Sequence, residues 1–197
     1  MHICRKHKIA FLAMPKNASR TISNALKTIG GNTEGSKHHN MIPPTGDMRG
    51  FFSFAVVRNP LSRTVSKWYD IFRHLDIGDD GFRKEAFNAY VVDMRAGKKG
   101  CGYNKFYLST QSSVLDTAQQ HFNKPIKIIS YENLNYDWDK LHFNPLVGKL
   151  PDKQIGKHRG SSGYGNWRSY YDDPKVIEKV VAVYSEDFDR YGYPYQI

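Results

Sequence analysis

The chain has 197 residues, 40% of them hydrophobic, and a formal net charge of +10. A chain of this length predicts one domain with a sizeable core, and it contains no internal repeats or low-complexity tracts. The charge predicts an anionic partner without choosing between a nucleic acid, an acidic polysaccharide, a membrane surface and a phosphorylated small molecule. Because the basic residues are scattered, we expect no specific nucleic-acid partner.

The cysteines and the first residues indicate a protein of a reducing compartment. Cys4 and Cys101 lie far apart in the sequence, which is neither a disulfide framework nor a metal-binding spacing. We therefore expect reduced thiols and no metal site. The N-terminal segment MHICRKHK is charged and has no apolar stretch long enough for a signal peptide or a membrane span. The expectation is a cytoplasmic protein without a membrane span.

The first predicted elements are a strand, a polar loop and a helix. Residues 9–14 are an apolar run, which is typical of a buried strand, and apolar residues recur at helical spacing from Ile22. The loop between them, residues 16–21, contains small and cationic residues. A helix start exposes backbone N–H groups and the positive end of the dipole, so this loop suits a phosphate or sulfate. The alternative is an ordinary turn in which Ser19 caps the helix and Lys16 is in solvent.

A second anion-binding pair is predicted after the next strand. A loop over residues 30–50, which contains His38 and His39, precedes an apolar strand over residues 51–57. Arg58 follows this strand, and Ser66 lies about two turns into a helix that starts at Pro60. A guanidinium and a hydroxyl at these positions could converge on one phosphate. The alternative is an arginine paired with an acid and a serine that faces water.

The rest of the chain is predicted to continue the alternation of strands and helices. The expected elements are a helix over residues 82–95, a basic glycine loop over 97–102, a strand over 126–131, a helix over 132–141, a cationic loop over 148–166 and a helix from Pro174. This alternation predicts an α/β fold with a central, mainly parallel sheet flanked by helices. The loops after Met14 and Val57 should then open at the same edge of the sheet, where such folds bind ligands.

Five segments, taken in order, resemble the sulfotransferases that use 3′-phosphoadenosine 5′-phosphosulfate (PAPS), especially the carbohydrate or heparan type. FLAMPKNASRTI is similar to their 5′-phosphosulfate loop, and FSFAVVRNPLSRTVSKWY is similar to their 3′-phosphate motif. SKHHNM resembles the Lys-His segment between these motifs, and ISYENLNYDW and VAVYSEDFDRYGY resemble later landmarks. The resemblance covers most of the chain. It implies a single sulfotransferase domain over residues 1–197, with a three-layer, P-loop-like fold.

The resemblance also implies roles for individual residues. Lys16 would neutralise the bridging oxygen as its bond to sulfur breaks. Arg58 and Ser66 would hold the 3′-phosphate, and His38, with His39 as the second candidate, would be the base for the acceptor hydroxyl. The residues expected at the cofactor are Lys16, Asn17, Ala18, Ser19, Arg20, Thr21, Arg58, Ser66 and Arg159. Arg20 and the segment KHRGSSG around Arg159 depart from the usual family pattern.

The implied reaction is transfer of the sulfuryl group from PAPS to an acceptor hydroxyl, without a metal. A carbohydrate is the favoured acceptor, and a small alcohol or a phenol is the alternative. Two other classes stay open. A nucleotide-dependent kinase or phosphotransferase would share the sheet and the anion loop, but it should need magnesium ligands and a triphosphate loop, which the sequence does not show. A non-catalytic polyanion-binding protein would need only a basic surface.

Overall fold

The structure is a computed structural model that describes residues 1–33, 47–72, 80–96, 109–150 and 165–197. The chain divides into two compact units. The sheet unit comprises Met1–Arg58 and Ser113–Ser161, and the helical unit comprises Asn59–Ser112 and Ser162–Ile197. The single domain expected over residues 1–197 stays a prediction, and the two units are described separately.

The sheet unit contains a five-stranded sheet with the strand order β3-β1-β2-β4-β5. The strands are β1 (His2–Cys4), β2 (Ile9–Leu12), β3 (Asn32–Thr33), β4 (Phe52–Val57) and β5 (Lys127–Ser130). β4 pairs in parallel with β2 on one side and with β5 on the other, whereas β1 pairs antiparallel with β2 and β3. The carboxyl ends of β2, β4 and β5 therefore lie at one edge of the sheet, as the sequence predicts.

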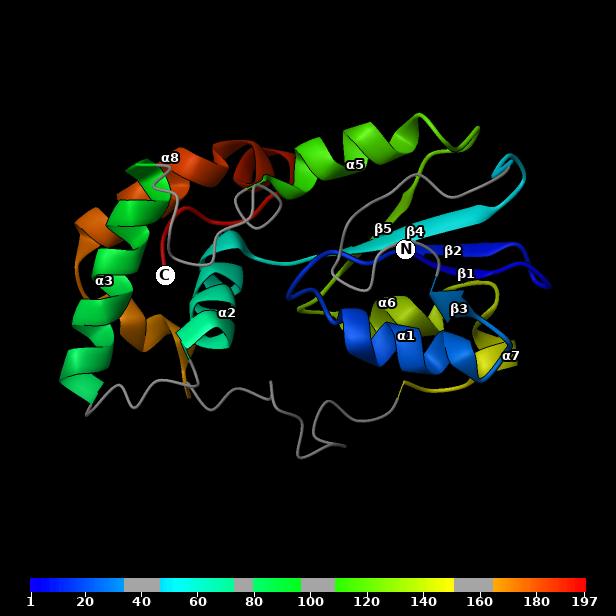
Figure 1. Cartoon of the computed structure of the whole chain (residues 1–197), viewed down its shortest axis with the longest axis horizontal. Helices are drawn as coiled ribbons and strands as arrows, with labels where there is room; N and C mark the ends of the chain where they lie inside the picture. Colours follow the sequence, from blue (N-terminus) through cyan, green and yellow to red (C-terminus); the bar gives the residue numbers. More distant parts are fainter. Residues whose placement is uncertain (34–46, 73–79, 97–108, 151–164) are drawn as a thin grey trace. The chain divides into compact units, whose positions relative to one another are not determined.

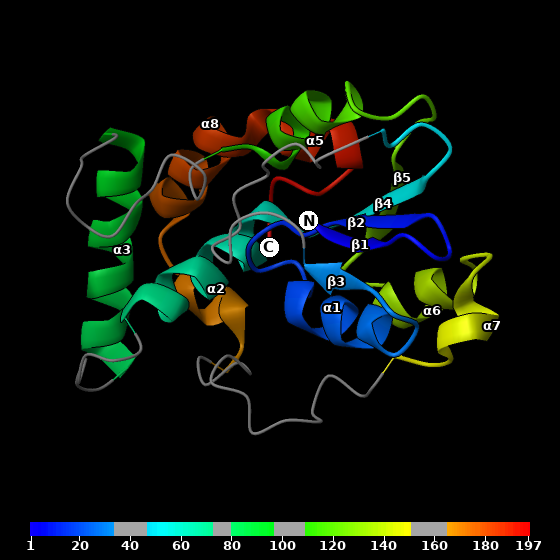
Figure 2. The same ribbon diagram turned by 45° about the vertical axis from the view of Figure 1, so that its right-hand side comes forward.

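Helices cover both faces of this sheet (Figures 1 and 2). The helices α1 (Ser19–Lys27), α6 (Leu134–Asp139) and α7 (Asn144–Val147) lie on one face, and α5 (Gln111–Gln119) lies on the other. The buried side chains of α5 recur at helical spacing, at Val114, Leu115 and Ala118. The predicted α/β class, with a mostly parallel sheet between helices, is confirmed.

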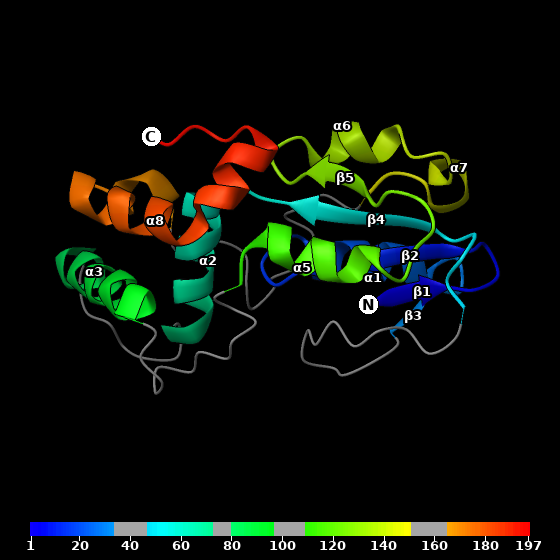
Figure 3. The same cartoon turned by 90° about the horizontal axis from the view of Figure 1, so that it is seen from above.

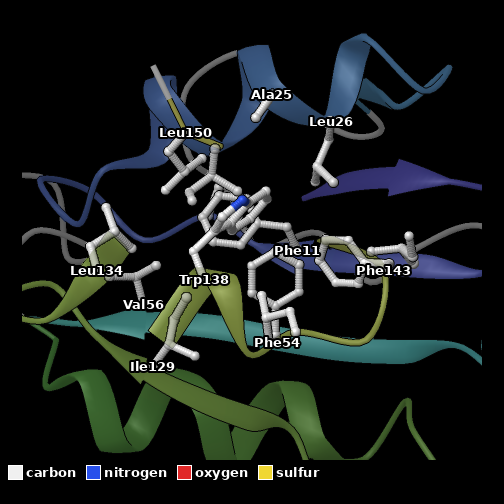
Figure 4. Close-up of a cluster of buried hydrophobic side chains, with 14 of the residues drawn as sticks. Phe11, Ala25, Leu26, Phe54, Val56, Ile129, Leu134, Trp138, Phe143 and Leu150 are labelled. Carbon is white, nitrogen blue, oxygen red and sulfur yellow. The ribbon is translucent and has the colours of Figure 1, made fainter. Parts of the chain in front are cut away.

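The core of the sheet unit is built around an indole. Trp138 of α6 is fully buried, and Figure 4 shows it among side chains of α1 and of the strands β2, β4 and β5. Its ring packs edge-on against Phe143, and its Nε1 donates a 3.0 Å hydrogen bond to the carbonyl oxygen of Gly148. This bond satisfies the one polar atom of the indole, which burial would otherwise penalise.

The helical unit consists of α2 (Pro60–Phe72), α3 (Asp80–Ala96), a 3₁₀ turn at Trp167–Tyr170 and α8 (Pro174–Tyr191) (Figure 3). Its core is largely aromatic and includes Trp68, Phe87 and Tyr184. The helices α2 and α8 each start with a proline behind a capping side chain. Asn59 Oδ1 accepts from the N–H of Leu61 at 2.9 Å, and Asp173 Oδ1 accepts from the N–H of Lys175 at 2.9 Å.

The sequence predicted β2, β4, β5, α1, α2, α3, α6 and α8, each within a few residues of its observed position. It did not predict β1, β3, α5, α7 or the 3₁₀ turn at Trp167–Tyr170. The largest difference is α5, because residues 103–114 show no clear period in the sequence, yet a helix starts at Gln111.

Replacing the central indole should destabilise the sheet unit. Trp138→Phe removes the bond to Gly148 and leaves a gap in a packed core, so the free energy of unfolding should fall by about 1–3 kcal/mol. Urea denaturation measures this loss. Tyr136→Ala on the same helix is the control because that side chain is exposed. A loss for Trp138→Phe no greater than for the control would contradict the assignment of this core.

Candidate active site

The loop between β2 and α1 has an unusual backbone. Lys16 and Ala18 adopt left-handed conformations, with φ angles of 68° and 57°, which residues other than glycine rarely do. Asn17 lies between them, and α1 begins at Ser19. Left-handed residues that alternate with other conformations turn successive N–H groups toward one side, forming the concave nest that binds anions in phosphate loops. Strain of this kind is concentrated at functional sites.

The start of α1 carries no side-chain cap. Its N-cap residue is Ala18, no side chain of the described residues caps the helix, and its first turn contains no acidic residue. The alternative in which Ser19 caps the helix is therefore wrong, since the Ser19 hydroxyl donates to the carbonyl oxygen of Met14 instead. The first N–H groups of a helix have no intrahelical acceptor. Together with the partly exposed Lys16, they make a positive site that can hold a phosphate or sulfate.

The neighbouring strand holds this loop in place. Asn17 is fully buried, and its Nδ2 donates a 2.7 Å hydrogen bond to the carbonyl oxygen of Val56 in β4. Arg58 follows β4 directly, and its Nη1 donates a 3.0 Å bond to the carbonyl oxygen of Lys16. The Arg58 guanidinium also lies 4.1 Å from the ring centroid of Tyr131, which follows β5. Residues at the ends of three parallel strands thus meet at the loop.

The structure brings some of the predicted site residues together. The residues of the loop, 16–21, lie beside Arg58 at one edge of the sheet unit, with the Arg20 side chain exposed and Thr21 partly buried. Ser66 lies in α2 of the helical unit and is only 5% exposed, so the alternative in which it faces water is wrong. Its convergence with Arg58 on one phosphate stays a prediction. His38, His39 and Arg159 lie outside the described residues.

Sequence reasoning missed two contributions to this edge. Asn17 was expected to offer its backbone N–H to the cofactor, but its side chain is the link between the loop and β4. Tyr131 was treated as the last residue of a strand. The parallel topology could have indicated both, because it places the ends of β2, β4 and β5 at one edge.

The described parts of the chain contain no cluster of three or more His, Cys, Asp or Glu side chains that could hold a metal ion. None of their helices combines the length and the apolar composition that a membrane span requires.

The comparison with protein families identifies the class of this protein. The sequence model of the sulfotransferase family matches residues 1–194, so the chain belongs to that family. The chain is thus a member of a transferase family whose reaction is sulfuryl transfer to an acceptor. Searches of curated proteins and of solved structures found no match.

Removing the link between the loop and β4 should cost stability. Asn17→Ala deletes a buried donor and leaves the Val56 carbonyl without that bond, so the free energy of unfolding should fall by about 1–3 kcal/mol. Asn24→Ala in α1 is the matched control, since Asn24 is exposed. Denaturant titration of both variants measures the difference. Equal stabilities for the two variants would mean that the buried amide does not hold the loop.

Proposed function

We propose that this protein transfers the sulfuryl group of PAPS to a hydroxyl group of a carbohydrate, with a histidine as the base. When bound, PAPS supplies the sulfuryl group that is transferred. The observation that carries the proposal is the loop between β2 and α1, in which left-handed Lys16 and Ala18 lead into an uncapped helix start beside Arg58. Family membership supports sulfuryl transfer as the reaction class.

The loop suits the 5′ end of the donor. The backbone N–H groups of residues 17–21 and the hydroxyl groups of Ser19 and Thr21 would hold the 5′-phosphate. The Asn17 N–H and the Ser19 hydroxyl donate to the carbonyl oxygen of Met14 in this structure, so both would have to exchange that acceptor for the phosphate. The ammonium of Lys16 would offset the negative charge that builds on the leaving oxygen. A preorganised loop is favourable here because its dipoles need not reorient during the reaction, and the two bonds from Asn17 and Arg58 supply that rigidity.

Arg58 and Ser66 would hold the 3′-phosphate and so distinguish PAPS from nucleotides without it. A guanidinium offers five N–H donors in a planar fork that matches the geometry of a phosphate. Arg58 would then link the two ends of the nucleotide, since the same side chain supports the 5′-phosphate loop and contacts the 3′-phosphate. Arg20 and Arg159 would add positive charge around the cofactor.

His38 would be the base for the acceptor hydroxyl, with His39 as the second candidate. The histidine would take the proton of the acceptor hydroxyl as the acceptor oxygen bonds to sulfur. The acceptor oxygen, the sulfur and the leaving oxygen would stay in line. The formal charge of +10 favours an anionic glycan as the acceptor. A small alcohol or a phenol is the alternative acceptor, and a cytoplasmic location is the expected one.

Product binding tests the donor site. At a concentration of about 100 times its dissociation constant, 3′-phosphoadenosine 5′-phosphate (PAP) should stabilise the protein by about 2.7 kcal/mol. The melting temperature should rise accordingly, without magnesium, and Ser66→Ala should reduce the rise, whereas Ser185→Ala at an exposed position of α8 should not. A larger shift with ATP and magnesium would favour a kinase. Salt-sensitive polyanion binding without any response to PAP would favour a non-catalytic binder.

Transfer of labelled sulfate tests the catalytic roles. With sulfur-labelled PAPS and a panel of glycans, alcohols and phenols, Lys16→Ala should lower the transfer rate by about 10²–10³-fold. His38→Ala should lower it by about 10²–10⁴-fold if His38 is the base, and His39→Ala is the comparison that decides between the two. Lys27→Ala, at an exposed position of α1, is the control for loss of a positive charge. Unchanged transfer in Lys16→Ala and in both histidine variants would overturn these roles.

A further inference from the structure

The helical unit contains buried charged side chains that the proposed chemistry does not use. Arg63 and Lys67 lie one turn apart on α2 and are each 1% exposed, and Asp187 of α8 is fully buried. Tyr184, one turn before Asp187, is 1% exposed. Charged side chains are almost never buried this completely unless they are paired, so the cluster needs an explanation.

Asp187 of α8 contacts α2 and the first two residues of α5, which belong to this unit. Its Oδ2 accepts hydrogen bonds from the N–H of Gln111 at 2.8 Å and from Gln111 Nε2 at 3.3 Å. Its Oδ1 accepts from the N–H and the Oγ of Ser112, at 2.8 and 2.9 Å. The carboxylate therefore stabilises the first turn of α5 through an interaction with its backbone dipoles. Arg63 Nη1 of α2 lies 3.9 Å from Oδ2, an ion pair that is longer than a hydrogen bond.

Lys67 is held by the same part of α8. Its Nζ donates a 3.1 Å hydrogen bond to the hydroxyl of Tyr184, which lies at a kink in α8 where the backbone is not helical. Burial lowers the pKa of Lys67 well below its ordinary value, with a further lowering by Arg63, whereas Asp187 opposes both effects. Burial also raises the pKa of Tyr184 to about 12. The charge of Asp187 therefore acts on both Arg63 and Lys67 of α2.

The position of Ser66 makes this cluster relevant to the donor site. Ser66 lies between Arg63 and Lys67 in the sequence of α2 and is the i+3 neighbour of Arg63, so a backbone change in this segment also moves the Ser66 hydroxyl. Loss of the Asp187 charge would leave the buried Arg63 and Lys67 without the carboxylate that pairs with Arg63 and opposes its effect on Lys67. Removing one member of a buried ion pair is strongly destabilising, because it leaves the other charge buried and uncompensated. A rearrangement of the Arg63–Lys67 turn would reduce that cost.

We propose that Asp187 is a positioning residue that sets the orientation of the Arg63–Lys67 turn of α2 and, through it, the contact of Ser66 with the 3′-phosphate. Asp187 touches neither phosphate. Its effect is on selectivity for nucleotides with a 3′-phosphate, because Ser66 contacts only that group. This inference rests on the proposed function, in which Ser66 holds the 3′-phosphate.

The test measures selectivity rather than stability. Dissociation constants for PAP and for adenosine 5′-phosphate, which lacks the 3′-phosphate, are measured by calorimetry on the whole chain. Asp187→Asn removes the charge and keeps one of the two oxygen acceptors for α5, while its NH2 group replaces the other. Its preference for PAP should fall by about tenfold or more, with affinity for adenosine 5′-phosphate little changed. Ser66→Ala should lose the same preference. The double variant should lose no more than Ser66→Ala alone, because both changes act on one contact.

The controls separate positioning from folding. Glu178→Gln removes a carboxylate from an exposed position of α8 and should keep the wild-type preference. If Asp187→Asn does not fold, Arg63→Met breaks the same pair from the α2 side and leaves the bonds of Asp187 to α5, so it should show the same loss. The role of Asp187 would be overturned if the affinities for PAP and for adenosine 5′-phosphate fell equally. It would also be overturned if the variant that folds kept the wild-type preference for PAP. A wild-type protein without any preference for PAP would instead overturn the proposed function, and this inference with it.

Discussion

The candidate site depends on the attachment of one loop to the strand beside it. The loop after β2 has two left-handed residues, a conformation that costs about 1–2 kcal/mol for each residue that is not glycine. Two hydrogen bonds offset this cost, one from Asn17 to the carbonyl oxygen of Val56 and one from Arg58 to that of Lys16. Without these bonds the loop could relax, and its N–H groups would no longer point to one side. The parallel pairing of β2 with β4 brings both partners to the same edge.

Much of this arrangement could be predicted from the sequence. Long apolar runs and helical spacing identified the central strands and the long helices, and Pro60 marked the start of α2. The short elements could not be predicted. β1 has three residues within a charged segment, β3 has two, and α7 has four, so none of them is long enough to show a period. The start of α5 is fixed by Asp187, a residue 75 positions or more away, which no local pattern reveals.

The candidate site was predictable as a set of residue types but not as a set of contacts. Motif resemblance selected Lys16, Arg58 and Ser66, and the structure adds how the first two are held. The Asn17 side chain, the ring of Tyr131 and the buried pair of Arg63 with Asp187 depend on tertiary packing. Each of these contacts joins segments that are far apart in the sequence. Arg63 and Lys67 carry charged side chains, yet both are buried, which the sequence does not indicate.

A crystal structure with PAP bound would test the account most directly. In that structure the 5′-phosphate should lie within hydrogen-bond distance of the backbone N–H groups of residues 17–21, and the 3′-phosphate should contact Arg58 and Ser66. His38 or His39 should lie on the side of the 5′-phosphate from which an acceptor hydroxyl would approach. A 5′-phosphate bound away from the loop between β2 and α1, or a 3′-phosphate that touches neither Arg58 nor Ser66, would contradict it.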